Sequence, residues 1–229
     1  MRMLGVLGGM SWTSTASYYR LLNEGVAARL AGLHSAPLLL HSVDFAPVAQ
    51  AQHDGDWDAT LAILSQAAQG LARGGAEGLL IATNTMHKVA DEVEQACGLP
   101  LLHIADATAD AILEDGVTKV GLLATAFTME QDFYVGRLRD RGIDVIVPDA
   151  VQRAEVHRII YDELCLDVVL GASRETYRGI IDSLVERGAE AVILGCTEIS
   201  LLVGPGDSIV ALYDTTRIHA EAGVSFILG

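Results

Sequence analysis

The feature that most constrains the fold of this chain is a phrase that occurs twice. Residues 75–85 read GAEGLLIATNT and residues 188–198 read GAEAVILGCTE, so the second copy starts 113 positions after the first (188 − 75) in a chain of 229 residues. Each copy is a Gly-Ala-Glu turn, a short apolar strand, and small polar residues where a helix should begin. A duplicated strand-to-helix unit predicts two similar lobes with one chemical group at each equivalent strand end. Those groups are Thr83 and Cys196.

Strand signals alternate with helical periodicity along the chain, which predicts an α/β fold with parallel sheets and right-handed crossovers. Strands are expected at residues 4–7, 38–42, 78–82, 101–103, 120–123, 144–147, 191–194 and 209–212. Helices are expected at residues 12–29, 57–72, 84–96, 105–113, 129–141, 151–166, 174–187 and 216–228. Ser11 is the expected N-cap of the first helix.

The second lobe is expected to begin near Ala105, because Val120–Thr125 repeats the pattern of the opening Leu4–Gly9. We expect the last helix to return to the first lobe. The predicted lobes are therefore residues 1–104 with 213–229, and residues 105–212.

Hydrophobic residues make up 51% of the chain and aromatic residues only 5%, so the predicted core is aliphatic. Continuous aliphatic strands are typical of parallel sheets covered by helices on both faces. No apolar run approaches the roughly 18–20 residues that a bilayer-spanning helix needs. The opening Met1–Leu7 is too short for a signal peptide. We interpret it as the first strand of a cytoplasmic protein with no membrane partner.

The formal charge of −15 and the presence of only two lysines, Lys88 and Lys119, argue against a nucleic-acid partner. An anionic small molecule would have to be held by local dipoles. The three cysteines, Cys97, Cys165 and Cys196, are odd in number and lack metal-ligand spacing. We therefore expect free thiols in a reducing compartment and no metal. The histidines form no H-x-x-x-H pair, which also argues against zinc.

The glycine-rich Gly5–Ser11 is interpreted as a tight strand-to-helix turn that can hold a small anion at the helix start. Its spacing is not G-x-G-x-x-G, and no acidic residue follows about 20 positions later, which argues against a dinucleotide. Lys88, without a phosphate-binding cup, is weak support for pyridoxal phosphate. Four histidines near predicted strand ends or helix starts either line a cleft or are structural: His41, His53, His87 and His103.

Cys196 stands at the carboxyl end of a predicted parallel strand, where open α/β sheets bind ligands. We expect backbone N–H groups of the following segment to favour the thiolate and lower the thiol pKa from about 8.5. Thr83–Thr85 occupies the equivalent place in the first lobe, as a helix cap or as a set of donors to a carboxylate. Cys97 and Cys165 are interpreted as packing residues.

Seven segments carry a resemblance that extends over essentially the whole chain. They are Gly8–Trp12, His41–Phe45, Thr83–Lys88, His103–Asp106, Gly121–Thr125, Ile159–Leu164 and Gly195–Glu198. On these segments the chain resembles the aspartate/glutamate racemases, a family of cofactor-independent amino-acid racemases. The resemblance implies two pseudo-symmetric lobes, each a four-stranded parallel sheet flanked by helices, with the active site between the lobes. It also implies no cofactor, an acidic amino acid as substrate, and a homodimer.

In the common family pattern both strand ends carry cysteine. One thiolate removes the α-proton while the opposite thiol delivers a proton to the other face. The resemblance thus implies that Cys196 deprotonates the L-substrate. The first position is Thr83 here, as in a branch associated with racemases that prefer L-aspartate and L-glutamate. The resemblance implies substrate contacts at Met10, Gln52, Thr125 and Thr128. Asn84, Thr85 and Thr197 are expected to donate hydrogen bonds to the α-carboxylate, and Glu198 is a further candidate substrate-binding residue.

Two departures from the family pattern shape the expected activity. A thiol can be tuned to ionise near neutrality, whereas the Thr83 alcohol cannot without a strong neighbouring base. We therefore predict that Thr83 donates or relays a proton, and that turnover is efficient only from the L side. Some aspartate racemases bind the distal carboxylate with an arginine and a lysine, in whose places this chain has Val48 and Cys165. A site accepting both aspartate and glutamate is expected.

Other functions stay open from the sequence. A single-cysteine decarboxylase or isomerase of the arylmalonate/maleate type is compatible with Thr83, although the Asn-Thr and Thr-Glu neighbours fit amino-acid racemases better. A hydantoin racemase fits less well for the same reason. From other classes, the chain is compatible with a catalytically decayed amino-acid-binding protein, or with a hydrolase that uses Cys196 as nucleophile.

Overall fold

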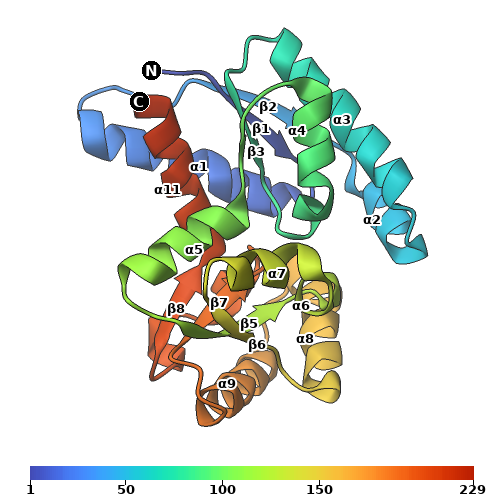
Figure 1. Cartoon of the computed structure of the whole chain (residues 1–229), viewed down its shortest axis with the longest axis vertical. Helices are drawn as coiled ribbons and strands as arrows, with labels where there is room; N and C mark the ends of the chain where they lie inside the picture. The colour runs from blue at the N-terminus through green and yellow to red at the C-terminus, as the bar shows by residue number, and fades with distance from the viewer. The chain divides into compact units, whose positions relative to one another are not determined.

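The computed structural model describes all residues, 1–229, and divides the chain into two compact units (Figure 1). The first unit is residues 1–103 with 219–229, and the second is residues 104–218. None of the helices is long and apolar enough to cross a membrane.

The first unit is built on a four-stranded parallel sheet with strand order β2-β1-β3-β4. Its strands are β1 (Leu4–Gly8), β2 (Leu38–Ser42), β3 (Gly78–Ile81) and β4 (Leu101–Leu102). Its helices are α1 (Trp12–Leu30), α2 (Phe45–Asp54), α3 (Trp57–Arg73), the 3-10 helix η1 (Thr85–Val89), α4 (Ala90–Cys97) and most of α11 (Thr215–Leu228).

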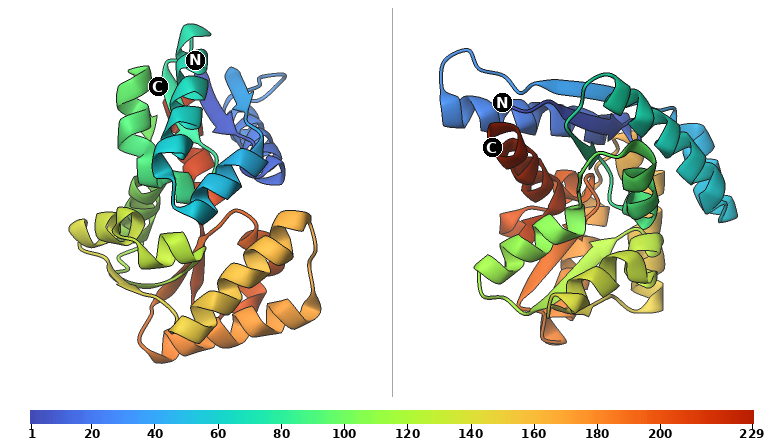
Figure 2. Two further views of the ribbon diagram at one scale, coloured as in Figure 1. Left: turned by 90° about the vertical axis from the view of Figure 1, so that its right-hand side faces the viewer. Right: turned by 45° about the horizontal axis from the view of Figure 1, so that its top comes forward.

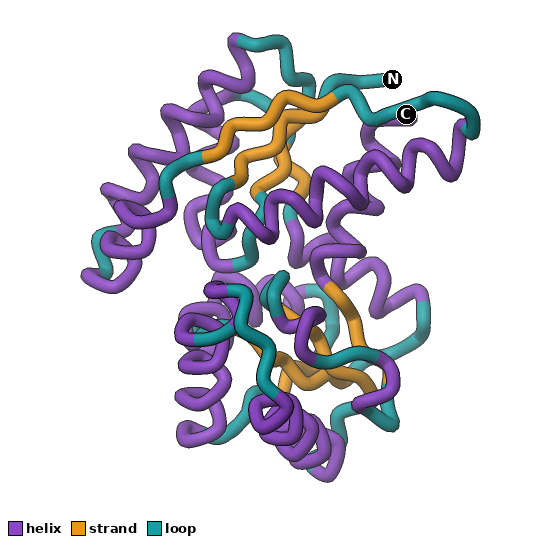
Figure 3. The backbone as a smooth tube through the Cα atoms, turned by 180° about the vertical axis from the view of Figure 1, so that it is seen from behind, coloured by secondary structure: helices purple, strands orange, loops and turns teal.

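Alternate residues of the first sheet enter two separate cores, as the period of a strand requires. Leu4 and Leu80 pack with residues of α1 and α11 in one buried cluster. Leu79 and Ile81 pack with residues of α3 and α4 in another. Figure 3 shows helices on both sides of these strands. The sheet is therefore buried on both faces, which explains its uninterrupted apolar strands.

The first and last helices of the chain lie side by side in the first unit (Figure 2). A Cβ on Gly25 of α1 would lie 2.6 Å from the Val224 side chain of α11, so only glycine permits this close approach. Arg29 forms an ion pair with Glu221 and donates a hydrogen bond of 3.2 Å to Ser225. The C-terminal helix is thus part of the first unit, as the sequence predicted.

The second unit repeats this topology, with strand order β6-β5-β7-β8 and all pairs parallel. Its strands are β5 (Lys119–Ala124), β6 (Asp144–Ile146), β7 (Ala191–Gly195) and β8 (Ala211–Asp214). Its helices are α5 (Ile104–Glu114), α6 (Ala126–Glu130), α7 (Asp132–Asp140), α8 (Ala150–Asp162), η2 (Leu164–Leu166), α9 (Gly171–Glu186), α10 (Ile199–Leu202) and η3 (Pro205–Asp207). The predicted α/β fold with two four-stranded parallel sheets is confirmed.

The duplicated phrase folds into the same local structure twice. Gly75 and Gly188 both adopt positive φ angles, 98° and 94°, which favour glycine. Two residues later, the Glu77 side chain accepts a hydrogen bond from the backbone N–H of Met3, 2.8 Å away. Glu190 likewise accepts bonds of 3.1 Å from the N–H groups of Thr118 and Lys119. Each glutamate thus ties the turn to the start of the neighbouring strand.

The structure differs from the sequence prediction in several places. The helices predicted at residues 84–96, 129–141 and 151–166 are each divided in two, and the short α10 was not predicted. Helix α2 was not predicted, yet Asp44 caps it and its Val48 is fully buried. The last strand was predicted at residues 209–212 but is β8, at Ala211–Asp214. Residues 208–210 form a turn instead, in which the Val210 N–H donates a hydrogen bond to the Ser208 side chain. The units divide after residue 218 rather than 212, because β8 pairs with β7.

Candidate functional site

Each sheet has one pair of adjacent strands from whose carboxyl ends the chain continues in opposite directions along the sheet. The strand orders put β1 beside β3, with Leu7 paired to Ile81, and β5 beside β7, with Ala124 paired to Gly195. Open α/β sheets bind ligands at such switch points. Nine of the predicted site residues follow one of these four strand ends: Met10, Thr83, Asn84, Thr85, Thr125, Thr128, Cys196, Thr197 and Glu198.

In the first unit we define the Thr83 cluster as Met10, Gln52, Thr83, Asn84 and Thr85. All of these side chains are buried except that of Thr83, which is partly exposed. Gln52 reaches the cluster from α2, where its amide contacts Met86 Sδ of η1 at 3.5 Å. Met10 and Met86 belong to the same buried core. The structure therefore brings these five residues to one end of the first sheet.

The backbone of Thr83 is held by a histidine. His87 lies four residues further along the chain, and its Nδ1 is 2.8 Å from the Thr83 carbonyl oxygen. A carbonyl oxygen can only accept, so His87 Nδ1 carries the hydrogen. The Thr83 hydroxyl makes no hydrogen bond to another residue of the first unit. The first unit thus fixes the main chain of Thr83 and supplies no base to its side chain.

His87 belongs to a buried histidine cluster that the sequence did not reveal. Its ring centroid lies 4.6 Å from that of His103 and 5.5 Å from that of His219. His219 Nε2 is 2.7 Å from the Leu102 carbonyl oxygen, and its Nδ1 is 2.9 Å from the Tyr18 hydroxyl. Neutral His219 thus donates through Nε2 and accepts from Tyr18 through Nδ1. Burial, and then the proximity of His87, lower the pKa of His219 to about 3.

Three other candidates from the sequence lie elsewhere. His41 and His53 are exposed, unlike His87 and His103. The Lys88 ammonium lies 3.9 Å from the centre of the Trp57 ring, a cation–π contact. Desolvation lowers the pKa of Lys88.

In the second unit we define the Cys196 cluster as Thr125, Thr128, Cys196, Thr197 and Glu198. Cys196 Sγ donates to Glu198 Oε2 at 3.0 Å, and the Thr197 hydroxyl donates to the same oxygen at 2.5 Å. The hydroxyl oxygens of Thr125 and Thr128 lie 3.2 Å apart after the neighbouring strand. Glu198 is 4% exposed, and Cys196 is partly buried. A carboxylate thus lies directly against the thiol.

The expected lowering of the Cys196 pKa is wrong. Burial, followed by the negative charge of Glu198 and by Cys165, raises the pKa of the Cys196 thiol well above its usual value. The backbone N–H of Glu198 acts in the opposite direction but is a smaller influence. The helix that follows Cys196, α10, begins only at Ile199 and has four residues, so it offers little dipole to a thiolate. The resting form is a protonated thiol.

Two further ionisable groups share the surroundings of Cys196. Burial and then Glu198 raise the pKa of Cys165 to about 12. Burial and then Cys196 raise the pKa of Tyr161. Cys97 lies in the other unit, where its Sγ contacts the Glu94 carbonyl oxygen at 3.6 Å. Cys165 is therefore a neighbour of the Cys196 cluster, and Cys97 is not.

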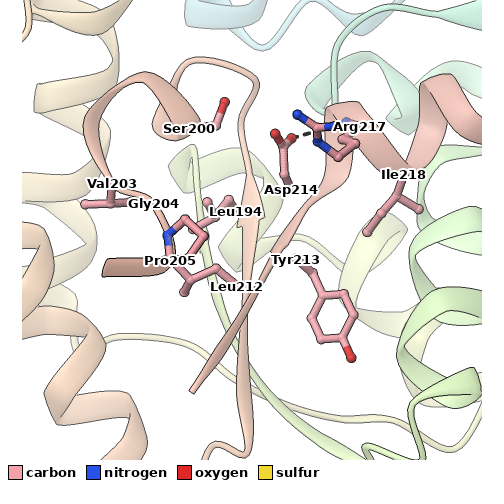
Figure 4. Close-up of a pocket in the computed structure, with 10 residues that line it drawn as sticks. All are labelled: Leu194, Ser200, Val203, Gly204, Pro205, Leu212, Tyr213, Asp214, Arg217 and Ile218. Atoms are coloured by element: carbon pink, nitrogen blue, oxygen red, sulfur yellow. Dashed lines mark hydrogen bonds between the residues drawn. The ribbon is translucent and has the colours of Figure 1, made fainter. Parts of the chain in front are cut away.

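The second unit also contains a cavity of about 520 Å³ between β7, β8 and the α10 segment (Figure 4). Its lining residues are Leu194, Ser200, Val203, Gly204, Pro205, Leu212, Tyr213, Asp214, Arg217 and Ile218. Asp214 accepts hydrogen bonds from the backbone N–H groups of Thr216 and Arg217 at the start of α11. No member of the Cys196 cluster lines this cavity, so it is distinct from the site that the sequence predicted.

Comparisons with known proteins agree with one another. Residues 7–223 match the Asp/Glu/hydantoin racemase family. A crystal structure of a candidate Asp/Glu racemase from Yersinia pestis is 53% identical, with each chain covered over 100% of its length and a TM-score of 0.94. In a second crystal structure, the chain of an aspartate racemase homologue from Pyrococcus horikoshii OT3 is 34% identical in sequence to this chain, with 100% of each chain covered and a TM-score of 0.87. The broad specificity amino-acid racemase RacX of Bacillus subtilis (strain 168) is 24% identical, covering 99% of this chain and 98% of RacX.

Proposed function

Because the chain belongs to the Asp/Glu/hydantoin racemase family, we propose that it is a cofactor-independent racemase of acidic amino acids. It converts L-aspartate, L-glutamate or both to the D-form. Cys196 removes the α-proton of the L-substrate, and Thr83 donates or relays a proton on the opposite face. The observation that carries the proposal is the chemistry of the two equivalent strand ends: a thiol in contact with a carboxylate after β7, and a hydroxyl after β3.

Removal of the α-proton leaves a carbanion, whose charge delocalises onto the α-carboxylate. Without a cofactor, that charge must be stabilised by donors aimed at the carboxylate. Asn84, Thr85 and Thr197 offer amide or hydroxyl donors next to the proposed proton-transfer residues, and backbone N–H groups at the start of η1 add to them. These groups are proposed to bind the α-carboxylate.

The distal carboxylate of the substrate is proposed to be held without a dedicated cation. Val48 is fully buried in the core of the first unit, and the Cys165 thiol is protonated because its pKa is raised to about 12. Neither position can form an ion pair with a carboxylate. A loosely defined distal site supports a substrate range that includes both aspartate and glutamate.

The proposal is tested by incubating the protein with L-aspartate or L-glutamate in deuterated water. Exchange of the α-proton is followed by NMR and chirality by chromatography. The expected result is exchange with formation of D-product, and neither in the Cys196→Ala variant. Exchange with full retention of configuration would disprove the role of Thr83. Binding without exchange would favour the amino-acid-binding alternative.

A second candidate, a single-cysteine decarboxylase or isomerase of the arylmalonate/maleate type, is favoured by one observation. Only one of the two equivalent strand ends carries a thiol, and chemistry with one proton-handling thiol needs no partner at Thr83. Consumption of an arylmalonate or of maleate, without α-proton exchange in amino acids, would establish this function in place of the first.

A further inference from the structure

We propose that the cavity of about 520 Å³ between β7, β8 and the α10 segment binds a free amino acid with a large apolar side chain. The carboxylate of this ligand lies against Arg217 and its ammonium against Asp214. No residue of the Cys196 cluster lines the cavity, so the site is separate from the proposed proton-transfer residues. The inference does not depend on the racemase activity and goes beyond it.

Most of the cavity wall is apolar. The side chains of this part of the wall are Leu194, Val203, Pro205, Leu212, Tyr213 and Ile218. The Tyr213 hydroxyl donates a hydrogen bond of 2.7 Å to Asp115 and points away from Asp214 and Arg217 (Figure 4), so the Tyr213 ring adds apolar surface. A volume of about 520 Å³ falls within the range of roughly 300–1,000 Å³ that is typical of small-molecule sites. The wall therefore favours a ligand with a sizeable apolar part.

Two opposite charges lie on one side of this cavity. Asp214 and Arg217 are three residues apart at the start of α11, and both line the cavity (Figure 4). Asp214 Oδ1 accepts hydrogen bonds from the backbone N–H groups of Thr216 and Arg217, at 2.9 and 3.3 Å. Within the second unit, Asp214 Oδ2 accepts no hydrogen bond and the Arg217 guanidinium forms no ion pair. Each group can therefore still bind a ligand group of the opposite charge.

The pair of charges decides which apolar ligand fits best. A simple carboxylic acid would be attracted by Arg217 but repelled by Asp214, and a simple amine would meet the reverse. A free amino acid carries a carboxylate and an ammonium on one carbon, so it can satisfy both side chains at once. An acidic amino acid fits less well, because Arg217 is the only cationic residue in the lining and the second carboxylate would face apolar side chains.

The cavity is framed by hydrogen bonds on two sides. Leu194 of β7 is paired with Asp214 of β8, and the Thr215 hydroxyl donates to the Leu194 carbonyl oxygen at 2.9 Å. Across the cavity, the backbone N–H of Gly204 donates to the Asp207 side chain at 3.0 Å. The ligand thus enters a wall that is already formed, which lowers the entropic cost of binding.

The first test compares ligands on the full chain by isothermal titration calorimetry. L-Phenylalanine is the probe. 3-Phenylpropionate lacks its ammonium, 2-phenylethylamine lacks its carboxylate, and L-alanine lacks its large side chain. L-Phenylalanine should bind, and each of the other three should bind about ten-fold or more weakly by comparison. Equal binding of 3-phenylpropionate and L-phenylalanine would overturn the role of Asp214.

The second test changes the two charged side chains. Arg217→Gln should weaken the binding of L-phenylalanine about ten-fold or more but should not weaken that of 2-phenylethylamine, which has no carboxylate. Asp214→Asn keeps an oxygen that can accept the two backbone hydrogen bonds, and it should weaken L-phenylalanine but not 3-phenylpropionate. The matched control is Arg174→Gln, which changes an exposed arginine of α9 and should leave all affinities unchanged. Thermal unfolding shows whether the variants are folded.

The third test locates the ligand, because an amino acid could instead occupy the site at Cys196. NMR cross-relaxation should connect the ring protons of L-phenylalanine to the methyl groups of Val203 and Leu212. Cys196→Ala should bind L-phenylalanine as the wild type does. No saturable binding, or binding that is equal in the wild type and Arg217→Gln, would overturn the proposal. Loss of α-proton exchange in L-aspartate would count against the proposed function only, since this binding is measured without it.

Discussion

The end of β3 and the end of β7 are the same structure with different chemistry. Both follow a Gly-Ala-Glu turn with a positive φ angle, and both lie beside the first strand of their sheet. After β3, His87 holds the carbonyl of Thr83 and leaves its hydroxyl without a base in that unit. After β7, Glu198 accepts directly from the Cys196 thiol.

The difference teaches that two copies of the same backbone can carry different reactive groups. After β3, His87 fixes the main chain of Thr83. After β7, burial and then Glu198 raise the pKa of the Cys196 thiol. If both act on one substrate, proton removal belongs to Cys196 and proton delivery to Thr83. The two directions of racemisation should then differ in rate, although their equilibrium does not change.

The largest effect on activity is expected from Cys196→Ser, which places a hydroxyl at the end of β7 as well as at the end of β3. A serine hydroxyl cannot supply a base near neutrality, so α-proton exchange from L-aspartate should fall about 10³-fold, within the range for loss of a general base. Exchange is measured by NMR in deuterated water. Cys97→Ser, in the other unit, should exchange normally. Residual exchange within about ten-fold of the wild type would show that another group removes the proton.

The opposite change makes both ends thiol-bearing, with Thr83→Cys. A thiol after β3 can be deprotonated far more readily than an alcohol. Turnover of D-aspartate should therefore rise by about ten- to a hundred-fold, while turnover of the L-enantiomer changes little. Chiral chromatography from each enantiomer measures both directions. The control is Thr118→Cys, an exposed position. Equal D-side rates in wild type and Thr83→Cys would end the argument from asymmetry.

The role of His87 separates the two ends further. Asparagine places an amide N–H near the position of Nδ1, whereas glutamine places it near Nε2. His87→Asn should therefore keep the bond to the Thr83 carbonyl, and His87→Gln should lose it. In the glutamine variant, D-product formed per α-proton exchanged should fall about ten-fold, with exchange itself preserved. If the two variants behave alike at equal thermal stability, His87 acts only as packing.

Much of the fold was predictable because its signals are local. The duplicated phrase and the apolar strands mark β3 and β7 within one residue of their observed ends. Helix α2 was missed because Pro47 and the short segment obscure its periodicity. The contacts of His87 and Glu198 were missed because side-chain hydrogen bonds depend on rotamers that no spacing specifies. Their positions, four residues after Thr83 and two after Cys196, were nevertheless visible.

A smaller effect concerns stability: the unfolding free energy of the first unit should depend on pH through His219. Buried His219 has a pKa of about 3 in the folded state, against about 6.5 when unfolded. Between these values the unfolded chain binds more protons, so this histidine lowers stability as pH falls below about 6.5 and has no such effect above it. The slope should be roughly 1 kcal/mol per pH unit. Trp12 and Trp57 both lie in the first unit, so tryptophan fluorescence reports its unfolding. The slope should shrink in His219→Gln.

The smallest effect tests whether the two turns are as alike as their backbones. A Cβ on Gly75 would meet no atom within 4 Å, and one on Gly188 would lie 3.3 Å from the flexible end of Lys119. The cost of alanine at either position is therefore the strain of its positive φ angle, about 1 kcal/mol. Gly75→Ala and Gly188→Ala should lower the unfolding free energy of their own units by similar amounts, measured by hydrogen exchange. A much larger loss at one turn would mean that the repeat is only apparent there, because equal backbones should carry equal strain.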